Sequence, residues 1–148
     1  MNQNKVYEIY IPKEALRSGK RVLYLMEFIQ EKNYIYYVGI TGTSNDSGVS
    51  SPLKRLSKHI FPTGKTFSVV KSRKLNLENT NIRFRFIIFN ENEDIEKAEK
   101  WLIWKLKSER RDLLNREIPE EPNIEKSIKE RVIKSFGLIA HTNEKIMS

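Results

Sequence analysis

Two β-rich runs, "RVLYLMEFI" and "YIYYVGIT", stand close together in the first third of the chain, and only the polar residues "QEKN" separate them. β-Branched and aromatic residues favour strands, and two such runs joined by a short polar stretch are typical of an antiparallel hairpin. The pattern therefore predicts a hairpin over residues 21–41. This hairpin is the firmest constraint on the fold.

The other elements are predicted from periodicity and from the residues that start and stop helices and strands. In chain order they are a short strand over 5–12, a helical turn ending at Gly19, the hairpin, a helix from Pro52, a strand over 82–89, a long helix over 95–113, and a helix over 124–136. This order predicts an α+β fold. Its centre is a small mixed or antiparallel three-stranded sheet flanked by helices, with an extra N-terminal strand and a C-terminal helix. The 148 residues fit a single domain, residues 1–148.

The chain is basic, with 27 Lys and Arg against 19 Asp and Glu, and a net charge of +8. No acidic residue lies between Asp46 and Glu78, a stretch that we call the basic block. Its cations are Lys54, Arg55, Lys58, Lys65, Lys71, Arg73 and Lys74. Such a one-sign block favours a polyanionic partner, and nucleic acid is the first candidate.

Other compositional features exclude several classes of site. No apolar run approaches the length that a membrane span needs, and the N-terminus lacks the apolar core of a signal peptide, so we expect a cytoplasmic protein without a membrane partner. The absence of cysteine excludes disulfides, thiolate zinc sites and a cysteine nucleophile.

A carboxylate interrupts the apolar stripe of the long predicted helix. Ile95, Ala98, Leu102, Leu106 and Leu113 recur at helical spacing, and Glu99 falls between apolar neighbours on the same face. An unpaired buried charge is costly, so Glu99 needs a cation, a metal ion or hydrogen-bond donors. A salt bridge, a tilted helix that exposes the side chain, or a metal-ligand role would each satisfy it.

The helix "SPLKRLSKHI" is predicted to bury Leu53, Leu56 and Ile60, which leaves Arg55 and His59 adjacent on its flank. An arginine suits phosphate because its planar fork donates two hydrogen bonds at once, and a histidine can donate a proton or contact phosphate. The alternative is that both are solvated surface charges. Their place in the basic block, directly after the tyrosine-rich strand, favours the phosphate role.

Alternation in "YIYYVGIT" places Tyr34 and Tyr36 on one face, expected to be core, and Tyr37 and Gly39 on the other. A glycine inside a strand often marks a position where another group must approach the backbone closely. The alternative is that the tyrosines are ordinary strand residues. In the strand over 82–89, Ile82, Phe84, Phe86 and Ile88 form a core face, and Arg83 and Arg85 are expected on a basic outer face.

Taken together, these residues resemble the GIY-YIG nuclease family over about residues 21–116. "VLY", ending at Tyr24, looks like the GIY motif, and "YVG", from Tyr37 to Gly39, looks like YIG. Arg55, His59, Glu99 and Asn115 stand at positions where the family has its arginine, histidine, metal-binding glutamate and asparagine. Val22 replaces the glycine of the first motif, and Ile40 stands where some members have a lysine.

The resemblance implies a metal-dependent DNA endonuclease that hydrolyses phosphodiester bonds with a single Mg²⁺ or Mn²⁺ bound by Glu99. Tyr24 or Tyr37 would activate the attacking water, Arg55 would stabilise the phosphate, and His59 would assist, with Gly39 and Asn115 in supporting roles. Double-stranded DNA would contact the basic residues Lys54, Lys58, Lys65, Lys71, Arg73, Lys74, Arg83 and Arg85. The alternative is a non-catalytic nucleic-acid-binding module on a degenerate fold of this family.

Residues 117–148 are predicted to be a linker followed by the C-terminal helix. Ile124, Ile128, Val132 and Phe136 form an apolar stripe on this helix. We expect the stripe to pack on its own domain, and a homodimer contact or further DNA contact are the alternatives.

Overall fold

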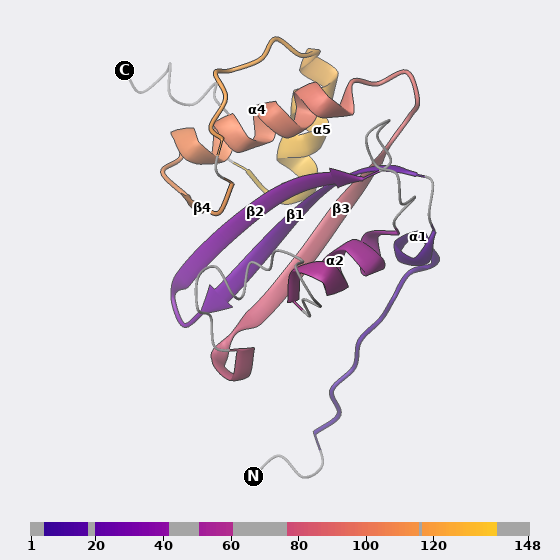
Figure 1. Ribbon diagram of the computed structural model, residues 1–148, viewed down its shortest axis with the longest axis vertical. Coiled ribbons are helices and arrows are strands. Elements are labelled where there is room, and N and C mark those ends of the chain that lie inside the picture. The colour runs from indigo at the N-terminus through magenta and orange to yellow at the C-terminus, as the bar shows by residue number, and fades with distance from the viewer. Residues whose placement is uncertain (1–4, 18–19, 42–50, 61–76, 116, 139–148) are drawn as a thin grey trace.

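The computed structural model describes residues 5–17, 20–41, 51–60, 77–115 and 117–138. In these residues a four-stranded mixed sheet of order β3-β1-β2-β4 lies between two layers of helices (Figure 1). The α+β fold class is therefore as predicted. The sheet has one strand more than the predicted three.

The predicted hairpin is present and forms the centre of the sheet. Strands β1 (Arg21–Gln30) and β2 (Asn33–Thr41) pair antiparallel along their whole length, and Gln30 pairs with Asn33. The turn is therefore only Glu31 and Lys32, and Glu31 adopts a left-handed φ of 56°. Strand β3 (Asn81–Phe89) pairs antiparallel with the other edge of β1.

The fourth strand corrects the predicted end of the long helix. Helix α4 covers Ile95–Ser108, with its first turn capped by the Asp94 side chain, which accepts a 3.0 Å hydrogen bond from the Lys97 amide. Arg110 then adopts a left-handed φ of 60°, which ends the helix. The chain continues into β4 (Asp112–Leu113), which pairs parallel with Ile35 and Tyr36. The predicted extension to Leu113 is wrong because Leu113 matches the helical spacing but lies in this strand.

The predicted N-terminal strand is also wrong. Residues 5–12 are extended, but they lie outside the four-stranded sheet. Val6, Tyr7, Ile9 and Tyr10 are all at least 75% exposed. A short helical turn, α1 (Lys13–Leu16), follows and packs beside α2.

One face of the sheet carries the larger core, under helices α4 and α5 (Lys126–Phe136). Leu23, Leu25 and Val38 of the sheet pack there against Trp101 and Leu106 of α4. From α5, the apolar stripe inserts Ile128, Val132 and Phe136 into the same core. The C-terminal helix therefore packs on its own domain, and Gly137 ends it with a left-handed φ of 64°.

The other face of the sheet is covered by α2 (Pro52–Ile60), which lies on the opposite side from α4 and α5 in Figure 1. Tyr24, Met26 and Phe28 of β1 form a second cluster there, together with Leu56 and Ile60.

Three sequence expectations about burial need correction. Tyr34 is 44% exposed rather than core, because it lies next to the turn of the hairpin, and Ile88 is 36% exposed. His59 is not on a solvated flank but buried. No helix among the described residues is long and apolar enough to cross a membrane.

Candidate active site

A buried hydrogen bond joins β1 to α2 at the second cluster. The Tyr24 hydroxyl lies 3.0 Å from Nε2 of His59, and the two residues are 2% and 8% exposed. Burial and, to a smaller extent, the positive charge of Arg55 lower the pKa of His59 from 6.5 to about 4. The imidazole is therefore neutral at pH 7, so that one of its ring nitrogens can accept a hydrogen bond. Since His59 is buried and hydrogen-bonded, the alternative that it is a solvated surface charge is excluded.

Gly39 makes room for the Tyr24 ring. The two residues are cross-strand partners, and a Cβ on Gly39 would overlap the Tyr24 hydroxyl and Cζ and lie 2.8 Å from Cε2. The close approach predicted from the glycine is confirmed, and the approaching group is the tyrosine of the neighbouring strand. Any larger residue at position 39 would push Tyr24 away from His59.

Tyr37 lies on the same face as Tyr24 and completes an aromatic cluster around His59. Its ring centroid is 4.8 Å from that of His59 in an edge-on arrangement and 6.3 Å from that of Tyr24. Burial raises the pKa of Tyr37, the Glu99 carboxylate raises it further, and the Arg55 guanidinium lowers it. Tyr37 is thus within electrostatic reach of both groups.

Glu99 of α4 is partly buried. Burial raises its pKa to about 7, Glu96 raises it as well, and Lys100 lowers it. No described residue forms a hydrogen bond or ion pair with this carboxylate. Tyr37 connects five residues from four elements, since its ring lies beside those of Tyr24 and His59 and it interacts electrostatically with Arg55 of α2 and with Glu99 of α4.

Asn115 supports the edge of β2 beside this region. Its side-chain oxygen accepts a 2.9 Å hydrogen bond from the amide of Val38, and its side-chain nitrogen donates a 2.9 Å hydrogen bond to the carbonyl of Val38. The amide of Asn115 thus continues the strand pairing that β4 begins at Ile35 and Tyr36. Val38 lies between Tyr37 and Gly39, so Asn115 holds the backbone that carries both.

The predicted DNA-contacting residues do not form one surface. Lys54 and Lys58 are exposed on α2, near His59. Arg83 and Arg85 lie on the opposite face of the sheet, where both approach Glu27. Lys65, Lys71, Arg73 and Lys74 lie outside the described residues.

The sequence interpretation did not single out Glu27, which is 4% exposed on β1. The available signal was alternation, since Glu27 falls on the same face as Leu23 and Leu25 in "RVLYLMEFI". A carboxylate in that position needs cations, and Arg83 and Arg85 supply them from the neighbouring strand.

Metal binding in this region would depend on one protein carboxylate. In the described part of the chain, no three His, Asp or Glu side chains lie close enough together to hold a metal ion. The Glu99 carboxylate still fits a divalent cation, since burial raises its pKa and a bound cation would relieve the cost of its charge. Mg²⁺ is commonly held by one or two carboxylates, with water and substrate oxygens completing the shell.

Fold and site together define an α+β domain with a tyrosine–histidine cluster between the sheet and α2. No family model, no curated protein and no solved structure matches the chain.

Proposed function

We propose that the chain is a metal-dependent DNA endonuclease of the GIY-YIG type that hydrolyses phosphodiester bonds with a single Mg²⁺ or Mn²⁺. The observation that carries this proposal is the hydrogen bond between Tyr24 and His59 over Gly39. This contact links strands β1 and β2, which carry the two motifs, with helix α2, which follows them in the chain. A tyrosine, a neutral histidine, an arginine and a carboxylate in one region are the groups that the proposed reaction needs.

Glu99 would hold the cation in this proposal. A bound divalent cation supplies Lewis-acid stabilisation of the phosphate and lowers the pKa of a bound water. The role of the protein is to present a carboxylate that is ionised when the cation binds. Because the pKa of Glu99 is about 7, cation binding below that pH releases a proton.

Two tyrosines compete for the role of general base. Tyr24 has the hydrogen bond to His59, but it is only 2% exposed, whereas Tyr37 is partly exposed and more accessible to water. With a pKa of about 4, His59 is too weak a base to take the proton of a phenol, whose pKa is near 10. His59 therefore orients the Tyr24 hydroxyl, and Arg55 opposes the rise in the Tyr37 pKa that burial and Glu99 cause.

Arg55 is assigned to the scissile phosphate, where a guanidinium can donate two parallel hydrogen bonds as negative charge develops. Lys54 and Lys58, exposed on the same helix, are assigned to the DNA backbone.

The test is nicking of supercoiled plasmid with Mg²⁺ or Mn²⁺, comparing the wild type with Glu99→Ala and Tyr37→Phe. Lys126→Gln is the matched control, since that side chain is 89% exposed on α5. We expect a loss of at least about 100-fold in Glu99→Ala and no change in Lys126→Gln. Full activity in both Glu99→Ala and Tyr37→Phe contradicts the assignment.

One observation favours a second candidate, a nucleic-acid-binding module without nuclease activity. Tyr24 and His59 are almost fully buried, as expected for a cluster that stabilises the fold. This candidate expects salt-sensitive binding of DNA and a wild type that does not cut several forms of DNA with either metal.

A further inference from the structure

A second set of polar residues lies on the opposite face of the sheet from the proposed active site. A cleft of about 290 Å³ opens there between the strands and the C-terminal end of α5. Its polar lining residues are Glu27, Tyr34, Tyr36, Arg83, Arg85 and Arg111. We call this the tyrosine–arginine cleft.

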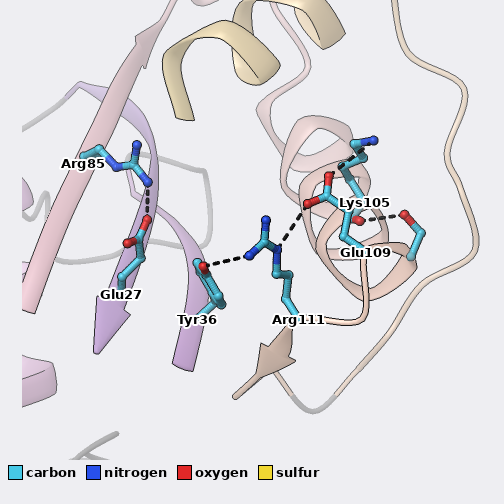
Figure 2. Close-up of polar contacts among 7 residues, drawn as sticks. Glu27, Tyr36, Arg85, Lys105, Glu109 and Arg111 are labelled. Carbon is cyan, nitrogen blue, oxygen red and sulfur yellow. Dashed lines mark hydrogen bonds and ion pairs between the residues drawn. The ribbon is translucent and has the colours of Figure 1, made fainter. Parts of the chain in front are cut away.

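Ion pairs and aromatic rings hold the arginines of this cleft in place. Glu27 lies between Arg83 and Arg85, at 3.5 Å from Nε of Arg83 and in a close ion pair with Arg85. The Arg85 guanidinium lies over the Phe136 ring, at 5.7 Å from its centroid. Figure 2 shows Arg85 of β3 reaching Glu27 of β1. The Glu27 carboxylate thus holds in place two guanidinium groups that line the cleft.

Arg111 enters the cleft from the segment after α4. Its Nε lies 3.3 Å from Glu109, its Nη1 donates a 3.4 Å hydrogen bond to the Tyr36 hydroxyl, and its guanidinium lies over the Tyr36 ring. In Figure 2 the side chain lies between these two partners. Glu109 is shared with the fully buried Lys105, whose Nζ is 3.4 Å away. The Glu109 carboxylate therefore cannot fully neutralise Arg111.

The cleft has an excess of positive charge. Three cationic side chains line it (Arg83, Arg85 and Arg111) with one carboxylate (Glu27), and Glu109, which pairs with Arg111 from outside the lining, also pairs with Lys105. Moreover, Nε of Arg85 is buried and has no hydrogen-bond partner in the described part of the chain. A buried donor of this kind, within a preformed group of guanidiniums, suits an anion such as phosphate.

Aromatic surface adjoins these cations. Tyr34 stacks on Tyr36, with centroids 6.5 Å apart and an interplanar angle of 19°, and Tyr34 is 44% exposed. A second hollow of about 470 Å³ shares Tyr34, Tyr36 and Arg111 with the first, and its further charged lining residues are Lys32, Arg110 and Asp112. An exposed aromatic ring beside cations is the combination that binds nucleotide bases and phosphates together.

We infer that the tyrosine–arginine cleft binds a nucleoside phosphate, with the base stacked on Tyr34 and the phosphate on Arg83, Arg85 and Arg111. This site is separate from the proposed active site, since Tyr24, Tyr37 and His59 lie on the other face of the sheet and Glu99 of α4 does not line the cleft. Two sources share this chemistry, a free mononucleotide and an unpaired nucleotide of a strand.

The test is calorimetric titration of the full chain with adenosine monophosphate, adenosine and ribose 5-phosphate. We expect saturable binding of adenosine monophosphate, and binding at least about tenfold weaker when either the base or the phosphate is missing. Absence of saturable binding, or equal binding of ribose 5-phosphate, overturns the inference.

Variants locate the site. Tyr34→Ala and Arg111→Gln are each expected to weaken the binding of adenosine monophosphate by about fivefold or more, and Lys126→Gln, with the same loss of charge as Arg111→Gln, by less than about twofold. Tyr34 is exposed, so its variant tests the site even if Arg111→Gln fails to fold. Unchanged binding in Tyr34→Ala overturns the inference.

A further titration with oligo(dA) of five nucleotides distinguishes the sources. Displacement of adenosine monophosphate by the oligonucleotide, with tighter binding, identifies a strand, and no displacement identifies the free nucleotide. Plasmid nicking shows whether nucleotide binding is independent of the proposed nuclease activity. Glu99→Ala should bind adenosine monophosphate normally, and Tyr34→Ala should nick plasmid as the wild type does.

Discussion

Gly39 and Tyr24 show how one missing side chain determines the geometry of a site. The Tyr24 ring occupies the space over Gly39 that a Cβ would need, and this position brings its hydroxyl to His59. The glycine is therefore required by its neighbour on β1 and not by its own backbone conformation.

Gly39→Ala should lower the free energy of unfolding by about 1–3 kcal/mol, because overpacking forces the Tyr24 ring to move. Urea unfolding measures the loss, and the NMR signals of the His59 ring report whether the hydrogen bond to Tyr24 is broken. Gly137→Ala is the control, since a Cβ there meets nothing within 4 Å and only its φ of 64° is strained. An alanine at position 39 that leaves both the stability and the His59 signals unchanged would contradict the packing described.

The burial of His59 makes the free energy of unfolding depend on pH in the acid range. Its pKa is about 4 in the folded chain against 6.5 without burial, so between these values the unfolded chain binds more protons. The free energy of unfolding therefore falls as the pH drops from 6.5 to 4, by at most about 3 kcal/mol, and this contribution is fully present above pH 6.5. His59→Gln should reduce this fall. Urea unfolding at pH 7 and pH 4.5 checks it, and an equal fall in wild type and variant would rule the effect out.

Glu99 has the opposite dependence on pH. Its pKa is raised from 4.5 to about 7, so the folded chain binds more protons between these values and stability falls as the pH rises through them. At pH 8, Glu99→Gln should stabilise the fold by about 1–2 kcal/mol, a value reduced for the partial solvation of the carboxylate.

Thermal unfolding at pH 8 checks this prediction and also tests metal binding without an activity assay. Mg²⁺ should raise the Tm of the wild type and not that of Glu99→Gln. Glu96→Gln, a change on the exposed neighbour, is the control that should keep the response to Mg²⁺. An equal Mg²⁺ response in wild type and Glu99→Gln would remove Glu99 from the metal site.

Beyond its pairing with β4, the edge of β2 is held by the side chain of Asn115. Strand β4 pairs with only Ile35 and Tyr36, and beyond them Asn115 supplies both hydrogen bonds to Val38. Without Asn115, the backbone between Tyr37 and Gly39 would lose the partner that fixes it.

Asn115→Ala should accelerate hydrogen exchange of the Val38 amide by at least about tenfold and cost about 1–3 kcal/mol of stability. Asn115→Asp is the matched control, because it keeps the acceptor for the Val38 amide and loses only the donor to the Val38 carbonyl. Faster exchange in the alanine variant than in the aspartate variant is expected. Equal exchange in both variants and the wild type would show that the edge is held in another way.

The elements that the sequence predicted well are those with strong local patterns. Hairpin β1–β2, strand β3, and the starts of α2 and α4 follow from alternation, Pro52 and helical periodicity. The extra strand at 5–12 was wrong because a strand needs a partner, and β propensity alone does not supply one. Strand β4 was not predicted because its two residues are too few to show a periodic pattern. Its pairing also depends on the turn at Arg110.

The described residues form two polar regions on opposite faces of the sheet. The side under α2 holds the Tyr24–His59 pair, whereas the side under α4 and α5 holds Glu27 and its arginines. For the site, the sequence predicted the residues around Tyr24 and Tyr37, because a glycine beside a tyrosine and a carboxylate on an apolar stripe are local signals. The sequence could not predict that Arg83 and Arg85 lie on the opposite face of the sheet from Tyr24 and Tyr37, because that depends on which face of each strand packs against α2.

We propose that the region around Tyr37, Arg55, His59 and Glu99 cuts DNA with a metal bound by Glu99. The single-turnover rate of plasmid nicking with Mg²⁺, measured for wild type and Glu99→Gln with chelator as the baseline, tests this proposal. We expect nicking by the wild type that the chelator abolishes, and a loss of at least about 100-fold in Glu99→Gln, which keeps the size of the side chain but not its charge. Nicking by Glu99→Gln at the wild-type rate would contradict it.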